Sequence, residues 1–97
     1  MEAEIFCKNI TSALDRYLSG QMNDTQLVGI VDDLVAEEFP EKIDAIVEKL
    51  INDLHVELAL FVVDPIARRE SRLYHGPNEL REIVASARKS LRQVTSY

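Results

Sequence analysis

Apolar residues recur every three or four positions along almost the whole chain, and this period restricts the fold more than any other sequence feature. The spacing places apolar side chains on one face of an α-helix, whereas a half-buried strand would show strict alternation. The three glycines and three prolines fall almost entirely between the periodic stretches, where they would end helices. We therefore predict an all-α fold of amphipathic helices.

Helix-ending and helix-starting residues delimit four periodic stretches. Gly20 suits the left-handed conformation that often ends a helix, Pro40 disfavours helical geometry in the residue before it, and Pro77 suits a first helical turn. Two short loops and one longer crossover would join the helices as an antiparallel four-helix bundle, in a single domain over residues 1–97. The helices are predicted over residues 2–18, from Asn23 or Asp24 to Phe39, over about 41–63, and from Pro77 onward.

The third predicted helix has the strongest apolar pattern. Its second half adds Val56, Ala59, Leu60 and Val63 to the apolar stripe, so that it is apolar nearly all round. Such a helix is typically covered on several sides, and we expect it to be central. The basic stretch 66–75 that follows is predicted to be an irregular connection or a short turn.

Composition narrows the class of function. The 97 residues are 46% hydrophobic and 29% charged, which is typical of one globular core, and the net charge of −6 argues against binding to nucleic acid phosphates. No apolar run approaches the roughly 20 residues that cross a bilayer. Cys7 is the only cysteine, which fits a reducing compartment, and the acidic N-terminus is unlike a secretory signal. We expect a cytoplasmic protein that binds neither nucleic acid nor membrane.

Residues that usually perform catalysis or bind metals are sparse. The two histidines and one cysteine lack the spacing of a zinc site, and neither a calcium loop nor a glycine-rich phosphate loop is present. His55 is predicted to be a partly buried structural residue. Glu57 lies in an apolar turn and is predicted to pair with Arg68, Arg69 or Arg72, because a buried carboxylate needs a partner. We expect no enzymatic activity, metal or cofactor.

Acidic residues are concentrated in the first two-thirds of the chain. Residues 1–64 hold 14 acidic and 4 basic residues, whereas residues 65–97 hold 3 and 7. Like charges four residues apart destabilise a helix by a few tenths of a kcal/mol per pair, so the fold does not require this pattern. It forms either a solvated surface or a docking surface for a cationic partner. The candidate partner-binding residues are Asp32, Asp33, Glu37, Glu38, Glu41, Asp44 and Glu48.

Four motifs spread over most of the chain resemble the colicin-D-like bacterial immunity proteins. The resemblance implies a cytosolic four-helix protein that protects a cell against a nuclease toxin, including toxins of contact-dependent growth inhibition. It further implies that acidic side chains occupy the cationic cleft of a ribonuclease, usually one that acts on transfer RNA, in place of the RNA phosphates. The motifs are Tyr17-Leu18-Ser19-Gly20, a helix from Asn23, Val63-Asp64-Pro65 followed by Arg68 or Arg69, and Asn78-Glu79-Leu80-Arg81.

The resemblance also implies where the toxin would bind. Family contacts come from the end of the third helix and the following loop, which here means Asp64 and either Glu57 or Glu70. Two valines precede Asp64 and leave this loop less acidic than the family pattern, so the stretch from residue 32 to residue 48 becomes the first choice. Asp64 stays in the candidate set, although it is also expected to cap the following segment and hold an arginine there.

Two functions remain open at this level. The first is an immunity protein, a monomer that covers a cognate nuclease toxin domain in a 1:1 complex. The second is a non-enzymatic acidic adaptor or a regulatory homodimer, in which the apolar second half of the third helix forms the subunit contact.

Overall fold

The structure, a computed structural model, describes residues 2–62, 64–69 and 74–95. Within these ranges the helices are α1 (Ala3–Leu18), α2 (Asp24–Glu37), α3 (Ala45–Ala59), α4 (Pro65–Arg68) and α5 (Pro77–Val94). The described residues contain no strand beyond an isolated bridge, and this confirms the predicted all-helical class. Among the described helices, none combines the length and the apolar character that a membrane span requires.

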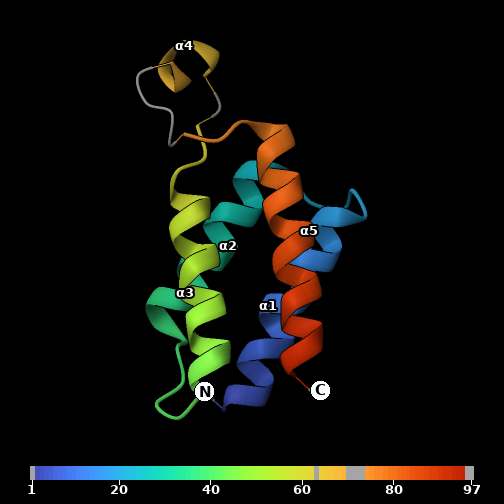
Figure 1. Ribbon diagram of the computed structural model, residues 1–97, viewed down its shortest axis with the longest axis vertical. Helices are drawn as coiled ribbons and strands as arrows, with labels where there is room; N and C mark the ends of the chain where they lie inside the picture. The colour runs from blue at the N-terminus through green and yellow to red at the C-terminus, as the bar shows by residue number, and fades with distance from the viewer. Residues whose placement is uncertain (1, 63, 70–73, 96–97) are drawn as a thin grey trace.

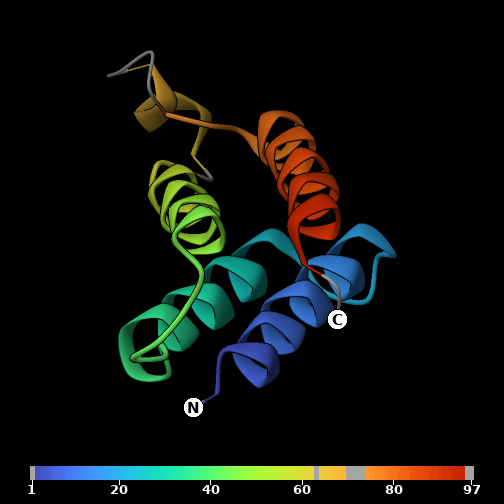
Figure 2. The same ribbon diagram turned by 60° about the horizontal axis from the view of Figure 1, so that its bottom comes forward.

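The four long helices surround a shared core. α1 packs against α2 and α5, and α3 packs against α5 and α2. α3 and α5 lie side by side and run in opposite directions in Figure 1, and α1 and α2 form a second pair in Figure 2. Within the described residues the structure thus confirms four long helices, each packed against two of the others, while the finer assignment of an antiparallel four-helix bundle stays a prediction.

The ends of α1, α2 and α5 follow the local signals in the sequence. The Asn23 side chain accepts a hydrogen bond from the Gln26 N–H at 2.8 Å, and the Gln26 side chain accepts one from the Asn23 N–H at 3.0 Å. This reciprocal pair is a capping box, which satisfies two backbone donors that a helix start leaves open. Gly20 adopts a φ of 85° after α1, and Pro77 occupies the first turn of α5.

The third helix is shorter than predicted. It was expected over about residues 41–63, but α3 covers Ala45–Ala59 because the Asp44 side chain accepts hydrogen bonds from the N–H groups of Ile46 and Val47 and begins the helix there. The expectation that its second half is covered on several sides is also wrong. Val56 is 59% exposed, so one face of this half is open to solvent.

The crossover between α3 and α5 is closed at its base by backbone hydrogen bonds. The His75 N–H donates to the Leu60 oxygen at 2.8 Å, and the Val62 N–H donates to the His75 oxygen at 2.9 Å. α4 lies within this crossover and beyond the ends of the two long helices (Figure 1). The predicted connection therefore contains a short turn, and its closure holds His75 beside the end of α3.

The core is centred on α1. Phe6 and Leu14 are fully buried, and the Phe6 ring lies 5.1 Å from the Phe39 ring, between centroids, at a tilt of 57°. Cys7 is buried in the same helix, and burial raises the pKa of its thiol, as expected for a small core residue that does not react. The α2–α3 connection is therefore fastened to α1 by the contact between the two rings.

Tyr17 links α1 to the start of α2, and replacing it with phenylalanine tests this contact. Its hydroxyl donates to Asp24 Oδ1 at 2.5 Å, and burial, followed by this hydrogen bond, raises the pKa of Tyr17 above its usual range. The folded protein therefore keeps a proton that the unfolded chain loses near pH 10, so the tyrosine contributes its full stability below about pH 10 and loses it as pH rises further.

We expect Tyr17→Phe to lower the free energy of unfolding by about 1 kcal/mol near neutral pH, because one hydrogen bond is lost. Above about pH 10 the stability of the wild-type protein should fall more steeply than that of the variant. Urea unfolding of both proteins at several pH values measures this difference, and parallel pH profiles would contradict it.

Candidate functional site

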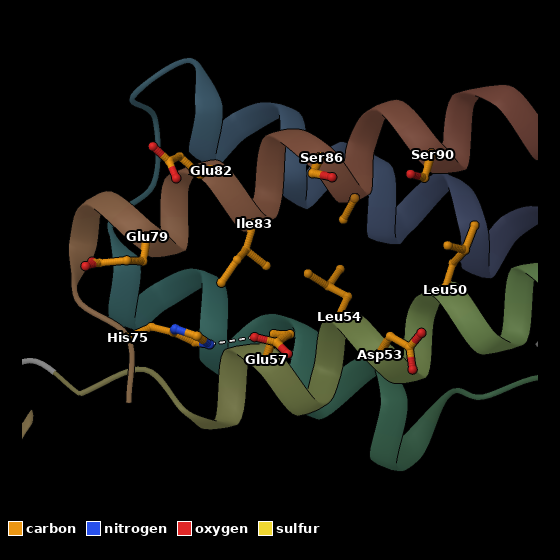
Figure 3. Close-up of a pocket in the computed structure, with 11 residues that line it drawn as sticks. Leu50, Asp53, Leu54, Glu57, His75, Glu79, Glu82, Ile83, Ser86 and Ser90 are labelled. Carbon is orange, nitrogen blue, oxygen red and sulfur yellow. Dashed lines mark hydrogen bonds and ion pairs between the residues drawn. The ribbon is translucent and has the colours of Figure 1, made fainter. Parts of the chain in front are cut away.

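A groove of about 450 Å³ runs between α3 and α5. Its floor is apolar, and Figure 3 shows Leu54 of α3 and Ile83 of α5 pointing toward one another there. Leu50 and Ala87 extend the floor toward the other end of the groove. The hollow thus lies over the seam where the two helices pack.

Carboxylates line both sides of this groove. Asp53 and Glu57, four residues apart, lie on the α3 side, and Glu79 and Glu82, three residues apart, lie on the α5 side (Figure 3). Side chains at these spacings share one face of a helix. The described residues that line the groove include His75 but no lysine or arginine, so carboxylates outnumber basic side chains in its lining.

Glu57 pairs with His75, and neither Arg68 nor Arg69, the two predicted partners that the structure describes, forms an ion pair with it. The distance from His75 Nε2 to Glu57 Oε2 is 2.5 Å, and the closure of the crossover positions the imidazole for this contact. The prediction of an arginine partner is wrong for Arg68, which lies over Gly76 instead, where its guanidinium would clash with a β-carbon at residue 76. Arg72 lies outside the described residues.

The other groove carboxylates differ in how far they are already engaged. Asp53 pairs with Lys49 at 2.8 Å, in a pair whose side chains are 61% and 76% exposed. Glu79 accepts a hydrogen bond from the Gly76 N–H at 3.1 Å. No described residue forms a hydrogen bond or an ion pair with the Glu82 side chain. An exposed pair such as that of Asp53 contributes at most about 1 kcal/mol, so a competing cation can displace Lys49 at little cost.

The charges of α5 are separated by face. Arg88 forms two hydrogen bonds with the Asp15 carboxylate, at 2.7 and 3.3 Å, and Arg81 donates to the Leu18 oxygen at 2.8 Å, so both arginines face α1. Glu79 and Glu82 lie on the groove side. A segment that is basic in total thus contributes two acidic side chains to the groove.

The acidic residues predicted from the sequence lie elsewhere on the molecule. They are exposed apart from Glu38, which is half-buried, and none lines the groove between α3 and α5. Most of them occupy the second half of α2, the connection to α3 and the first turn of α3, whereas Asp64 lies beyond the opposite end of α3. They are Asp32, Asp33, Glu37, Glu38, Glu41, Asp44, Glu48 and Asp64.

Three of these predicted residues have structural contacts. Asp32 Oδ1 lies 2.8 Å from Nε2 of His55, which confirms His55 as a partly buried structural residue. Asp44 caps α3, and Asp64 caps α4 by accepting a hydrogen bond from the Ile66 N–H at 2.9 Å. The expected capping role of Asp64 is therefore confirmed, and the suggested contact residue Glu70 lies outside the described residues.

Four others form what we call the acidic face: Asp33, Glu37, Glu41 and Glu48. Each is exposed, and within the described part of the chain none of the four side chains has a hydrogen bond or an ion pair. Asp33 and Glu37 share one side of α2 at a spacing of four residues. The acidic face thus carries charges that no contact in the described fold uses.

The sequence pattern did not predict Asp53, Glu79 and Glu82 as members of one acidic site. A signal was present, because the pair Glu79 and Glu82 flanks Leu80 and lies next to Ile83, both on the apolar stripe of the last helix. The net charge of this segment does not reveal the pair, since the arginines of the same helix outnumber the two glutamates.

Neither a possible metal site nor a match to a known protein points to further functional residues. Within the described ranges, no group of three or more His, Cys, Asp or Glu side chains could hold a metal ion. Comparison with protein-family models, with curated proteins and with solved structures found no match. The acidic face and the groove are therefore the two surfaces from which a function can be argued.

Proposed function

We propose that this chain is an immunity protein that binds and neutralises a basic nuclease toxin, in the manner of the colicin-D-like family. The observation that carries the proposal is the acidic face, a set of exposed carboxylates without partners among the described residues. A nuclease that binds RNA must present cations to the phosphate backbone, and the same cations attract an array of carboxylates. The expected toxin is a ribonuclease that acts on transfer RNA, and a four-helix bundle is the scaffold.

The repulsion between the carboxylates of the acidic face favours a role in binding over a role in stabilising the fold. Asp33 and Glu37 repel each other across one helical turn, which costs a few tenths of a kcal/mol without any compensating contact in the described residues. In a complex with a cationic cleft the same charges accelerate association and set the orientation of the partners. A specific interface buries about 800 Å² per partner. The accessible surface of 6304 Å² readily supplies this area in a 1:1 complex.

A second candidate function rests on exposed apolar side chains of α3. Ile46 is 60% exposed and Val56 is 59% exposed, which is consistent with an adaptor or a homodimer that uses this helix. Light scattering distinguishes the immunity protein, which is expected to be a monomer, from the homodimer. A stable dimer whose contact covers the acidic face would favour the homodimer.

Charge reversal of the acidic face tests the proposed function. The pairs Asp33→Lys with Glu37→Lys and Glu41→Lys with Glu48→Lys leave the capping residue Asp44 intact. At low salt we expect each pair to slow association with the cognate nuclease toxin domain by about tenfold or more, and the two pairs together to abolish protection of cells. Stopped-flow mixing with a catalytically inactive form of that domain measures the rate.

The matched control is Ser12→Lys with Asn78→Lys, Ala85→Lys and Gln93→Lys, four exposed positions on α1 and α5 that together change the net charge by the same amount as either pair. It should slow association far less than either pair, because none of its positions belongs to the acidic face. Equal effects of the control and of both pairs would mean that the acidic face acts only through the net charge of the protein. A wild-type protein that neither binds nor protects would refute the proposed function.

A further inference from the structure

The groove between α3 and α5 differs from the acidic face because it combines carboxylates with an apolar floor. A smaller hollow of about 330 Å³ between α1 and α2 offers a comparison within the same chain. Its lining includes one basic and one acidic side chain, Arg16 and Asp33. The α3–α5 groove has four carboxylates and no lysine or arginine among the described residues that line it. Its charge therefore selects a cationic occupant, and its floor selects an apolar one.

The length of the groove indicates the size of the occupant. The lining residues extend from Leu50 to Glu57 on α3 and from Glu79 to Ser90 on α5. At a rise of 1.5 Å per residue these stretches are about 10 and 16 Å long. A segment of two to three helical turns, with one or two aliphatic side chains directed at Leu54 and Ile83, matches this length.

The arrangement of charge indicates the pattern of the occupant. Carboxylates flank the floor on both sides, Asp53 and Glu57 on α3 and Glu79 and Glu82 on α5. A segment in the groove therefore meets negative charge to the left and right of its apolar ridge. An amphipathic helix with lysine or arginine on both borders of its apolar stripe presents the complementary pattern, and such helices bind in apolar grooves through residues spaced three and four apart.

We infer that the α3–α5 groove receives a basic amphipathic helical segment of the partner protein. The inference rests on the proposed function, because the segment is taken to belong to the same basic toxin. It adds a second contact with the toxin. The acidic face is the convex partner that enters a cleft of the toxin, whereas the groove is the concave partner that receives a helix of the toxin. Glu82 is the primary contact for the incoming cation, since no described residue forms a hydrogen bond or an ion pair with its side chain. A second cation of the segment replaces Lys49 as the ion-pair partner of Asp53.

The experiment uses a peptide probe, so that it does not depend on the toxin. The probe is a peptide on the order of 14 residues, with leucines at helical spacing and lysines at the remaining positions, and its control is the same composition in scrambled order. The groove variant is Glu82→Lys with Ser86→Lys, two exposed positions on α5. The matched control variant is Glu4→Lys with Ser12→Lys, two exposed positions on α1 with the same change in net charge.

We expect saturable binding of the amphipathic peptide to the wild-type protein, with backbone amide shifts concentrated in α3 and α5. The groove variant should bind the peptide about tenfold more weakly or worse, and the control variant should bind it as the wild type does. Absence of binding, equal binding of the scrambled peptide, or equal loss in both variants would each overturn the inference.

Binding to the toxin separates this inference from the proposed function. Loss of affinity in the groove variant, beyond that of the control variant, supports the inference. Unchanged affinity in the groove variant, together with loss in the acidic-face pairs, overturns the inference and leaves the proposed function intact. A toxin that does not bind the wild-type protein refutes the proposed function, while the peptide result still decides whether the groove accepts a basic helix.

Discussion

Alanine in place of Phe6 is expected to lower the free energy of unfolding by about 3–5 kcal/mol. Phe6 is fully buried, and its ring contacts Phe39 in the connection between α2 and α3. Its removal deletes a large apolar contact and leaves a cavity in the core beside α1. This helix packs against both α2 and α5. A domain of this length is stable by about 5–15 kcal/mol, so the variant should lose a large share of its stability.

Chemical denaturation measures this loss, and Phe39→Ala supplies the comparison. Phe39 is only half-buried, so its replacement should cost less than that of Phe6. The double variant should cost less than the sum of the single ones by about 0.5–1.5 kcal/mol, because the ring contact is lost only once. A loss below about 1 kcal/mol for Phe6→Ala would contradict the expected cavity, because the core would then close around the gap.

Aspartate in place of Ile51 is expected to prevent cooperative folding at pH 7. Ile51 is fully buried in the middle of α3. The substitution removes apolar burial worth about 2–5 kcal/mol and places a carboxylate in a core whose described buried residues are all hydrophobic. The matched control is Asn52→Asp, which adds the same charge to the exposed neighbouring position and should leave the protein folded. Circular dichroism during thermal unfolding compares the two variants.

The pH dependence of the Ile51 variants identifies the introduced charge as the cause. Burial raises the pKa of the new carboxyl above the value near 3.9 that it has in the unfolded chain. The protonated form is therefore tolerated below about pH 4, and the stability associated with it is lost as pH rises through the folded pKa. Asparagine has the shape of aspartate but does not titrate. The difference in the free energy of unfolding between Ile51→Asn and Ile51→Asp should therefore shrink from pH 7 to pH 4. A constant difference would exclude burial of the charge.

Helix ends could be predicted wherever the signal was local. Asn23 and Gln26 form a capping box within four residues of chain, and Gly20 and Pro77 act through their own backbone preferences. The start of α3 was missed because the apolar stripe continues before Asp44, while the Asp44 side chain caps the helix later. Periodicity describes which residues can share a face, but it does not decide where backbone donors are satisfied.

The candidate site was predictable only in part. The acidic character of residues 32–48 and the exposure of Asp33 and Glu37 follow from composition and helical spacing. The pairing of Asp32 with His55 does not, because it joins α2 to α3 across 23 residues of sequence. The same holds for Glu57 and His75, which the closed crossover brings together over 18 residues.

The sequence by itself determined the all-helical class, most helix ends and the excess of acidic charge, since each is local or a sum over residues. Only the tertiary structure decided which charged faces meet: Arg88 turns to Asp15 on α1, while Glu79 and Glu82 line a groove with α3. The physical reason is that the period of a helix specifies which side chains share a face. Which other helix contacts that face depends on how the helices pack around the core.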